Sequence, residues 1–127
     1  MLRLRIFRAF TLVELLVVMA ILALLLSIAV PRYMRSVEQS RETVLHANLA
    51  LTRHMLDKFY EDNGKYPELL DDLVSNKYLR SLPQDPITGS NTSWIVVRPQ
   101  AADEGAVYDI RSGAGGTALD GTAYGDW

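Results

Sequence analysis

The chain has 127 residues, and its 13 Lys and Arg against 15 Asp and Glu give a formal net charge of -2. This length leaves room for one small domain. Because the sequence has no cysteine, a disulfide-stapled domain, a thiol enzyme and a cysteine-ligated metal site are excluded, and the near-neutral charge gives no general reason to bind nucleic acid.

Apolar residues are concentrated in one block near the N-terminus. Residues 10–30 contain 18 apolar residues of 21, whereas residues 31–127 contain 38 of 97. The stretch from Thr11 to Val30 would be roughly 30 Å long as a helix, about the thickness of bilayer hydrocarbon. A cleaved secretory signal usually has a shorter apolar region that ends at a small-residue cleavage site. We therefore expect a retained membrane helix, and the arginines at positions 3, 5 and 8 favour a cytoplasmic N-terminus.

Glu14 is the one charged residue inside this block. A carboxylate in the centre of a membrane helix costs about 2.5–3.5 kcal/mol, and less near its end. Two explanations stay open. Thr11 and Glu14 have the spacing of a capping box, which would satisfy amides at the start of the helix. Alternatively, the carboxylate is paired with a cation brought to the same depth.

Helical patterning continues beyond the apolar block. Pro31 removes one helical amide, which predicts a bend rather than an end of the helix. Val37, Val44, Leu51, Met55 and Phe59 cluster near one face, with Leu45, Leu49 and Leu56 beside them. Asn63-Gly64 is a stop signal. We predict one helix from about Thr11 to Asp62, amphipathic over residues 32–62, with His46 and His54 as surface histidines.

The remaining residues predict a small head. Pro67 and the apolar residues after it predict a short helix near 67–76. Two apolar segments predict an antiparallel sheet near 93–111, followed by a Gly-rich loop over 112–127. The predicted fold class is α+β, with a long N-terminal helix packed on a small antiparallel sheet.

The stretch RAFTLVELLVV, residues 8–18, resembles the processing signal of type IV pilins and type II secretion pseudopilins. The resemblance implies cleavage of a basic leader, residues 1–9, between Ala9 and Phe10, and N-methylation of Phe10. Glu14 matches the acidic position of the family, and Pro31 matches its helix-perturbing proline. Ala9 is a departure, because the family pattern has Gly at that position.

Cleavage would create a positive amine at membrane depth, where Glu14 of a neighbouring subunit could pair with it. An uncompensated charge in dry surroundings is the costly outcome, so the pair would set the register between subunits. Removal of the leader would also take the net charge from -2 to -5, with 10 basic against 15 acidic residues. The segment 10–31 would then be held in the membrane by its apolar length alone and could move into a filament.

The stretch YPELLDDLVSNKYLRSLPQDPITG, residues 66–89, resembles the head of the type II secretion major pseudopilin. The resemblance is strong over residues 8–31, good over 60–89 and weak after Ile110. In that family the C-terminal region folds around calcium, which implies Asp120, Asp126 and Ser112 as candidate ligands. The family loop has an Asp where this chain has Gly115 or Gly116, and a flexible tail is the alternative.

The resemblance implies a pilin-like structural subunit and not an enzyme. Its expected partners are further copies in a helical filament, minor pseudopilins, prepilin peptidase, the inner-membrane assembly platform and, before extraction, membrane lipid. The expected location is the inner membrane, single-pass, with residues 32–127 as a periplasmic head. A minor pilin of a type IV pilus or DNA-uptake system is the alternative. A membrane-anchored enzyme lacks support, since the sequence has no phosphate loop or nucleophile elbow.

Overall fold

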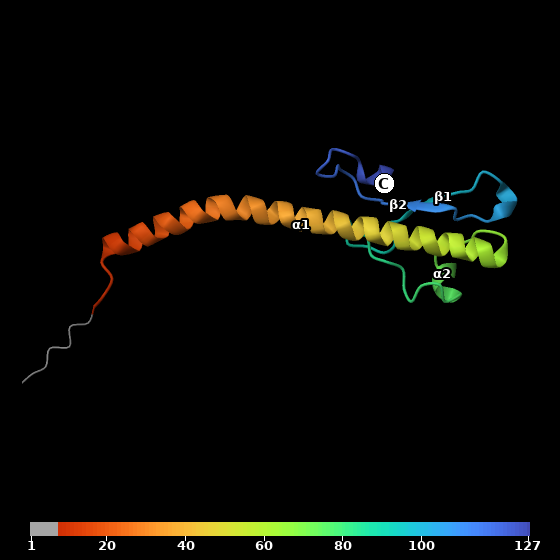
Figure 1. Ribbon diagram of the computed structural model, residues 1–127, viewed down its shortest axis with the longest axis horizontal. Helices are drawn as coiled ribbons and strands as arrows, with labels where there is room; N and C mark the ends of the chain where they lie inside the picture. Colours follow the sequence, from red (N-terminus) through yellow and green to blue (C-terminus); the bar gives the residue numbers. More distant parts are fainter. Residues whose placement is uncertain (1–7) are drawn as a thin grey trace, which may run out of the picture. The chain divides into compact units, whose positions relative to one another are not determined.

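The computed structural model describes residues 8–127, which divide into two compact units, one ending at Val37 and the other comprising Glu38–Trp127. One helix, α1 (Leu12–Asn63, 52 residues), contributes to both units (Figure 1). The long helix of the predicted α+β fold is confirmed. It begins and ends within one residue of the predicted bounds.

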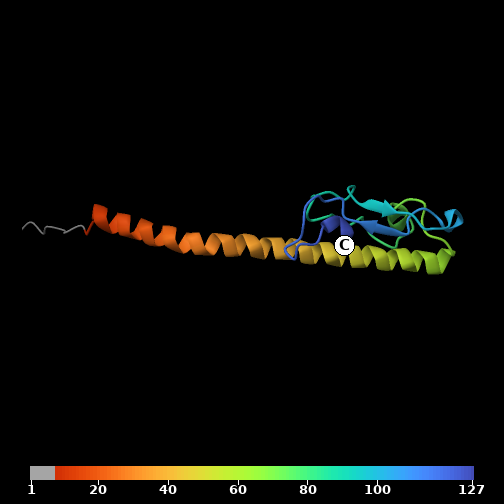
Figure 2. The ribbon, with the colours of Figure 1, turned by 90° about the horizontal axis from the view of Figure 1, so that it is seen from above.

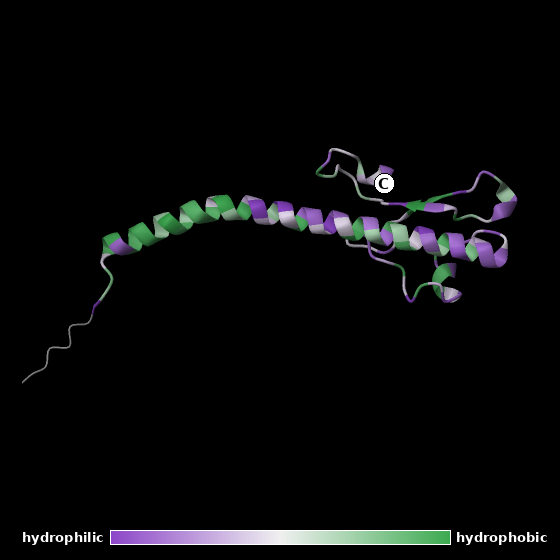
Figure 3. Cartoon of the chain, in the orientation of Figure 1, coloured by the Kyte–Doolittle hydropathy of each residue, from purple (hydrophilic) through white to green (hydrophobic). Residues whose placement is uncertain are grey.

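From Leu15 to Val30 α1 has one polar residue, Ser27, and the hydropathy colouring of Figure 3 shows this stretch as almost entirely hydrophobic. The large apolar side chains from Leu12 to Val30 are all exposed in the isolated chain. No described part of the first unit covers this surface, so the residues must find their apolar surroundings outside the chain.

In the second unit one face of α1 packs against the head, which lies along one side of the helix in Figure 2. The buried residues of this face are Leu45, Leu49, Thr52, Leu56 and Phe59. They are spaced alternately four and three residues apart, as one face of a helix requires. Val44 and Leu51, which we expected near the centre of the core face, are 47% and 46% exposed. The face of α1 that packs in the core is therefore centred on Leu45, Leu49 and Leu56, and not on Val44 and Leu51 as we predicted.

The sheet has two antiparallel strands, β1 (Ile95–Val97) and β2 (Asp109–Arg111), with Val96 opposite Ile110. Ile110 is fully buried, whereas Ile95 and Val96 are about half exposed. The strand segment of β2 therefore faces the core, and β1 forms the outer edge. Two short 3-10 helices follow the strands, η1 (Ala102–Glu104) after β1 and η2 (Tyr124–Asp126) after β2.

The short helix of the head, α2 (Asp72–Ser75), has only four residues, although we expected a helix near 67–76. The turns before it are closed by bonds between residues three apart, from Asp72 N to Leu69 O at 3.0 Å and from Leu73 N to Leu70 O at 3.2 Å. Three-residue bonds make tight turns rather than an α-helix. Leu73 from this segment is fully buried in the core.

Asp85 is a fully buried carboxylate whose hydrogen bonds hold together two distant parts of the head. Its Oδ1 accepts the backbone amides of Ile87 at 2.8 Å and Thr88 at 3.3 Å. Its Oδ2 accepts the hydroxyl of buried Ser112 at 2.5 Å. A buried carboxylate is tolerated when its oxygens are satisfied in this way. The loop that begins at Pro83 is thereby fixed to the segment that follows β2.

We predict that Asp85→Ala lowers the free energy of unfolding by about 3 kcal/mol, because it leaves buried donors without an acceptor. Asp71→Ala is the matched control, since the Asp71 side chain makes no capping bond and is exposed. Urea unfolding of both variants, followed by tryptophan fluorescence, measures the difference. Equal midpoints for the two variants would show that the Asp85 network contributes nothing to stability.

Candidate functional site

The predicted cleavage site lies in exposed, non-helical chain immediately before α1. Ala9 is exposed and Phe10 is 84% exposed. The rest of the predicted leader, residues 1–7 with Arg3 and Arg5, lies outside the described residues. The bond between Ala9 and Phe10 is therefore open to a peptidase, as processing at this position would require.

The first turn of α1 contains a complete capping box. The backbone amide of Thr11 donates to Glu14 Oε2 at 2.9 Å, and the amide of Glu14 donates to Thr11 Oγ1 at 3.1 Å. The Thr11 hydroxyl also contacts Glu14 Oε2 at 3.3 Å. Within residues 8–127, the second carboxylate oxygen, Oε1, makes no hydrogen bond. The cap therefore uses one oxygen of Glu14 and leaves the other available to a partner.

The first half of α1 meets the length and composition of a membrane-crossing helix, and it is the one such helix among the described residues. Pro31 lies inside α1 and does not end it. Because proline has no amide hydrogen, the carbonyl of Ser27 loses its usual partner. The bend that we expect at Pro31 stays a prediction.

The three candidate calcium ligands have different surroundings. Ser112 is buried against Asp85. Asp120 is exposed, and its Oδ1 accepts the amide of Thr122 at 3.0 Å and its hydroxyl at 2.6 Å. Asp126 lies in η2 and is exposed. In the described part of the chain, no three acidic or histidine side chains are grouped to hold a metal ion.

Residues 112–127 are folded, not a flexible tail, because Ala118 and Tyr124 belong to the core. Glu42 of α1 holds this segment: its Oε1 accepts the amide of Leu119 at 2.8 Å and the hydroxyl of Tyr124 at 3.0 Å. Composition gave no signal for this role, since a glutamate on a helix is normally solvated.

Arg53 and His46 make further contacts with the same region. Arg53 donates to Asp109 Oδ1 at 2.7 Å, to the carbonyl of Ile110 at 3.1 Å and to the carbonyl of Trp127 at 2.5 Å. His46 stacks on the Trp127 ring, with the centroids 3.8 Å apart and the planes at 8°. His46 is exposed, as we expected, and its ring has a packing partner that periodicity alone did not reveal.

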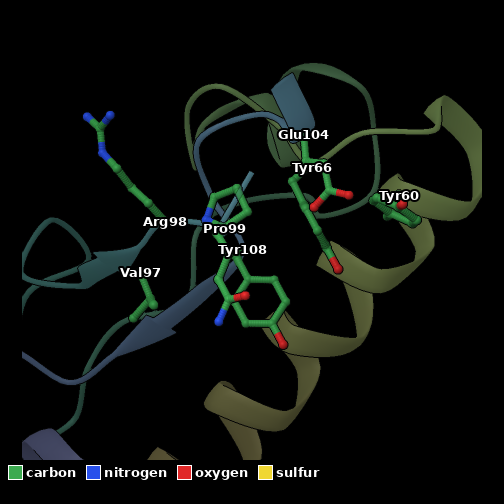
Figure 4. A pocket seen from close by; sticks show the side chains of 8 residues that line it. Tyr60, Tyr66, Val97, Arg98, Pro99, Glu104 and Tyr108 are labelled. Carbon is green, nitrogen blue, oxygen red and sulfur yellow. The ribbon is translucent and has the colours of Figure 1, made fainter. Parts of the chain in front are cut away.

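A pocket of about 590 Å³ lies at the far end of α1, beside the loop that joins the strands (Figure 4). Tyr60, Tyr66 and Tyr108 line it, and the Tyr66 and Tyr108 rings meet edge to face at 5.3 Å. Burial, together with the negative charge of Asp57, raises the pKa of Tyr66 above its ordinary value of 10.0. Three tyrosines and Glu104 therefore line one pocket.

Tyr124 supplies a prediction about alkaline pH. Burial and the hydrogen bond to Glu42 raise the pKa of Tyr124 from 10.0 to about 12. The folded state therefore holds this proton more tightly, so the stabilisation is complete below pH 10 and is lost as the pH rises through about 12. Between these pH values, Tyr124→Phe should lose less stability than the unmodified chain, as measured by urea unfolding at each pH. Tyr33→Phe, a change in the first unit, is the control and should follow the unmodified chain; a Tyr124→Phe curve parallel to it contradicts the prediction.

Comparisons with known proteins identify the N-terminal segment and the chain as a whole. The Prokaryotic N-terminal methylation motif matches residues 4–30. The chain is 35% identical over 95 residues to the type II secretion system core protein G of Klebsiella pneumoniae, covering 62% of this chain and 68% of that protein. It is 30% identical to the Escherichia coli protein of that name, over 93% of this chain and 91% of the relative.

The Pseudomonas aeruginosa protein of the same name is 34% identical over 93 residues, which is 61% of this chain and 66% of that protein. No solved structure matches. The methylation motif covers Ala9, Phe10 and Glu14, and the Escherichia coli relative extends the similarity through the head. This chain therefore belongs to the family of the type II secretion system core protein G, a family of pseudopilins.

Proposed function

We propose that this pseudopilin is a structural subunit of a periplasmic pseudopilus, which assembles from the inner membrane and drives type II protein secretion without catalysing a reaction. The observation that carries the proposal is Glu14, the one charge in the apolar block of residues 10–30. One of its carboxylate oxygens lies in a cap, and the other makes no hydrogen bond within residues 8–127. The relatives' names support the secretion system, and they do not favour the alternative of a minor pilin.

Processing is the first step of the proposal. A prepilin peptidase would cut between Ala9 and Phe10 and methylate the new amine. Before extraction, the apolar half of α1 would lie in lipid, with the N-terminus cytoplasmic and the head periplasmic. Because the exposed side chains from Leu12 to Val30 carry no charge besides Glu14, the segment could exchange lipid for the apolar surfaces of other subunits.

Pairing between subunits is the second step. The free Oε1 of Glu14 would accept a hydrogen bond from the Phe10 amine of a neighbour while Oε2 stays in the cap. The capping and pairing explanations are therefore compatible. A charge-assisted bond of this kind is about twice as strong as a neutral one, and its main effect would be to fix the register.

The head offers a second apolar surface for assembly. Val44 and Leu51 are about half exposed, and they follow Glu42 by two and nine residues, so they lie on the other side of α1 from it. The head covers the Glu42 side. We propose that neighbouring copies or minor pseudopilins cover the Val44 side, and that the inner-membrane assembly platform adds each subunit from below.

Mass spectrometry of the purified protein tests processing. We expect a mature chain that begins at Phe10 and carries one added methyl group when the prepilin peptidase is present. The full chain from cells without the peptidase is the control. A chain that keeps Met1 in the presence of an active peptidase would argue for a simple anchored protein.

Glu14→Gln separates the cap from the charge, because glutamine can serve in a capping box and carries no charge. We expect Glu14→Gln to be processed normally but to yield at least about tenfold fewer sheared filaments, since one lost charge pair at membrane depth is worth more than 1.4 kcal/mol. Thr11→Val, which removes the capping hydroxyl and keeps the charge, should be processed and assemble close to the unmodified chain. Normal filaments from Glu14→Gln would restrict Glu14 to the capping role.

A further inference from the structure

Calcium binding in residues 112–127 is expected from the family resemblance, and the side chains present do not fit it. Calcium takes six to eight oxygen ligands, with carboxylates prominent among them. The Ser112 hydroxyl is already bonded to Asp85, and Asp120 Oδ1 already accepts two bonds from Thr122. Positions 115 and 116 are glycines, which offer no carboxylate. Of the three candidates only Asp126 has a carboxylate without a hydrogen bond among the described residues, and one carboxylate is far short of the ligands that calcium requires.

Glu42 brings a negative charge to this segment from α1. Its Oε1 accepts the Leu119 amide at 2.8 Å and the Tyr124 hydroxyl at 3.0 Å. Leu119 lies within a turn closed by the bond from Ala118 N to Thr122 O at 2.7 Å, and Tyr124 follows the turn by two residues. One carboxylate thus holds both the turn and the segment after it on α1, which is comparable to what a bound cation does when it gathers oxygens from several parts of a loop.

The contact continues along the same stripe of α1. His46 is four residues after Glu42, and Arg53 is seven after His46, so the three side chains lie on one helix face. His46 stacks on Trp127, and Arg53 donates to the Trp127 carbonyl at 2.5 Å. The Trp127 indole in turn donates to Thr122 Oγ1 at 2.7 Å. The turn and the residues after it therefore contact α1 at three successive positions, Glu42, His46 and Arg53.

We propose that Glu42, His46 and Arg53 form a clasp that holds residues 117–127 on α1 without calcium. The clasp is made of direct hydrogen bonds and one ring stack, and it requires no ligand from outside the chain. It concerns how the head is stabilised, so it holds or fails independently of filament assembly.

The test uses the full chain in detergent micelles, with calcium chloride or with the chelator EGTA. We expect superimposable melting curves and equal hydrogen exchange of residues 112–127 in the two conditions. A melting temperature raised by calcium, or exchange in 112–127 slowed by calcium, overturns the proposal.

Glu42→Ala tests the clasp itself. We expect amides of residues 117–124 to exchange at least about tenfold faster, while amides of α1 around Leu49 and Leu56 keep their protection, because the loss opens the segment locally. Glu61→Ala is the matched control on the same helix, since Glu61 is exposed and far along α1 from Glu42. Unchanged exchange in Glu42→Ala overturns the proposal.

Tyr124→Phe keeps the test decisive if Glu42→Ala disturbs the whole head. It removes one hydroxyl and retains the buried ring, so the core should stay folded. We expect a smaller, measurable acceleration over residues 117–124. Exchange identical to that of the unmodified chain would show that the bond to Glu42 does not hold the segment, and would count against the clasp.

Discussion

One unbroken helical backbone has to serve two kinds of surroundings. From Leu12 to Val30 its side chains are apolar all round and exposed in the isolated chain, whereas from Leu45 to Phe59 one face is buried against the head. Burial of a large aliphatic side chain is worth about 1.5–3 kcal/mol. In the second half of α1 this stabilisation comes from burial against the head of the same chain. In the first half of α1 it can come only from lipid or from other subunits, so an isolated monomer in water is unfavourable.

The local features of this helix were predictable from the sequence because they depend on neighbours three and four residues apart. The Thr11–Glu14 cap, the continuation through Pro31 and the end at Asn63 all follow from such short-range chemistry. The phase of the core face was not predictable. Val44 and Leu51 are as apolar as Leu45 and Leu49, and periodicity cannot say which of two apolar faces meets the head. A helix that contacts a head on one side and is proposed to contact other subunits elsewhere has a reason to carry both faces.

The contacts that close the head lay beyond sequence reasoning because their partners are far apart in the chain. Glu42 bonds residues 77 and 82 positions away, Arg53 bonds residues up to 74 positions away, and Asp85 bonds Ser112 across 27 positions. Each of these side chains is ordinary for its local position. They gain partners only because the later part of the chain folds back alongside α1. This folding also places Ala118 and Tyr124 of the Gly-rich stretch in the core. For the same reason, the spacing of the candidate calcium residues did not show that Ser112 and Asp120 have other hydrogen-bond partners.

Two carboxylates of α1, Glu14 and Glu42, are used in comparable ways. Glu42 accepts hydrogen bonds from an amide and a hydroxyl of the same chain, so its negative charge is stabilised within the head. Glu14 satisfies an amide and a hydroxyl of its own turn with one oxygen and retains a second oxygen in a stretch without any other charge. In water that oxygen would be solvated at no cost, but in lipid it lacks a partner. The difference between the two glutamates is therefore environmental rather than chemical. Glu14 therefore needs a partner from a neighbouring chain, whereas Glu42 has its partners within the head.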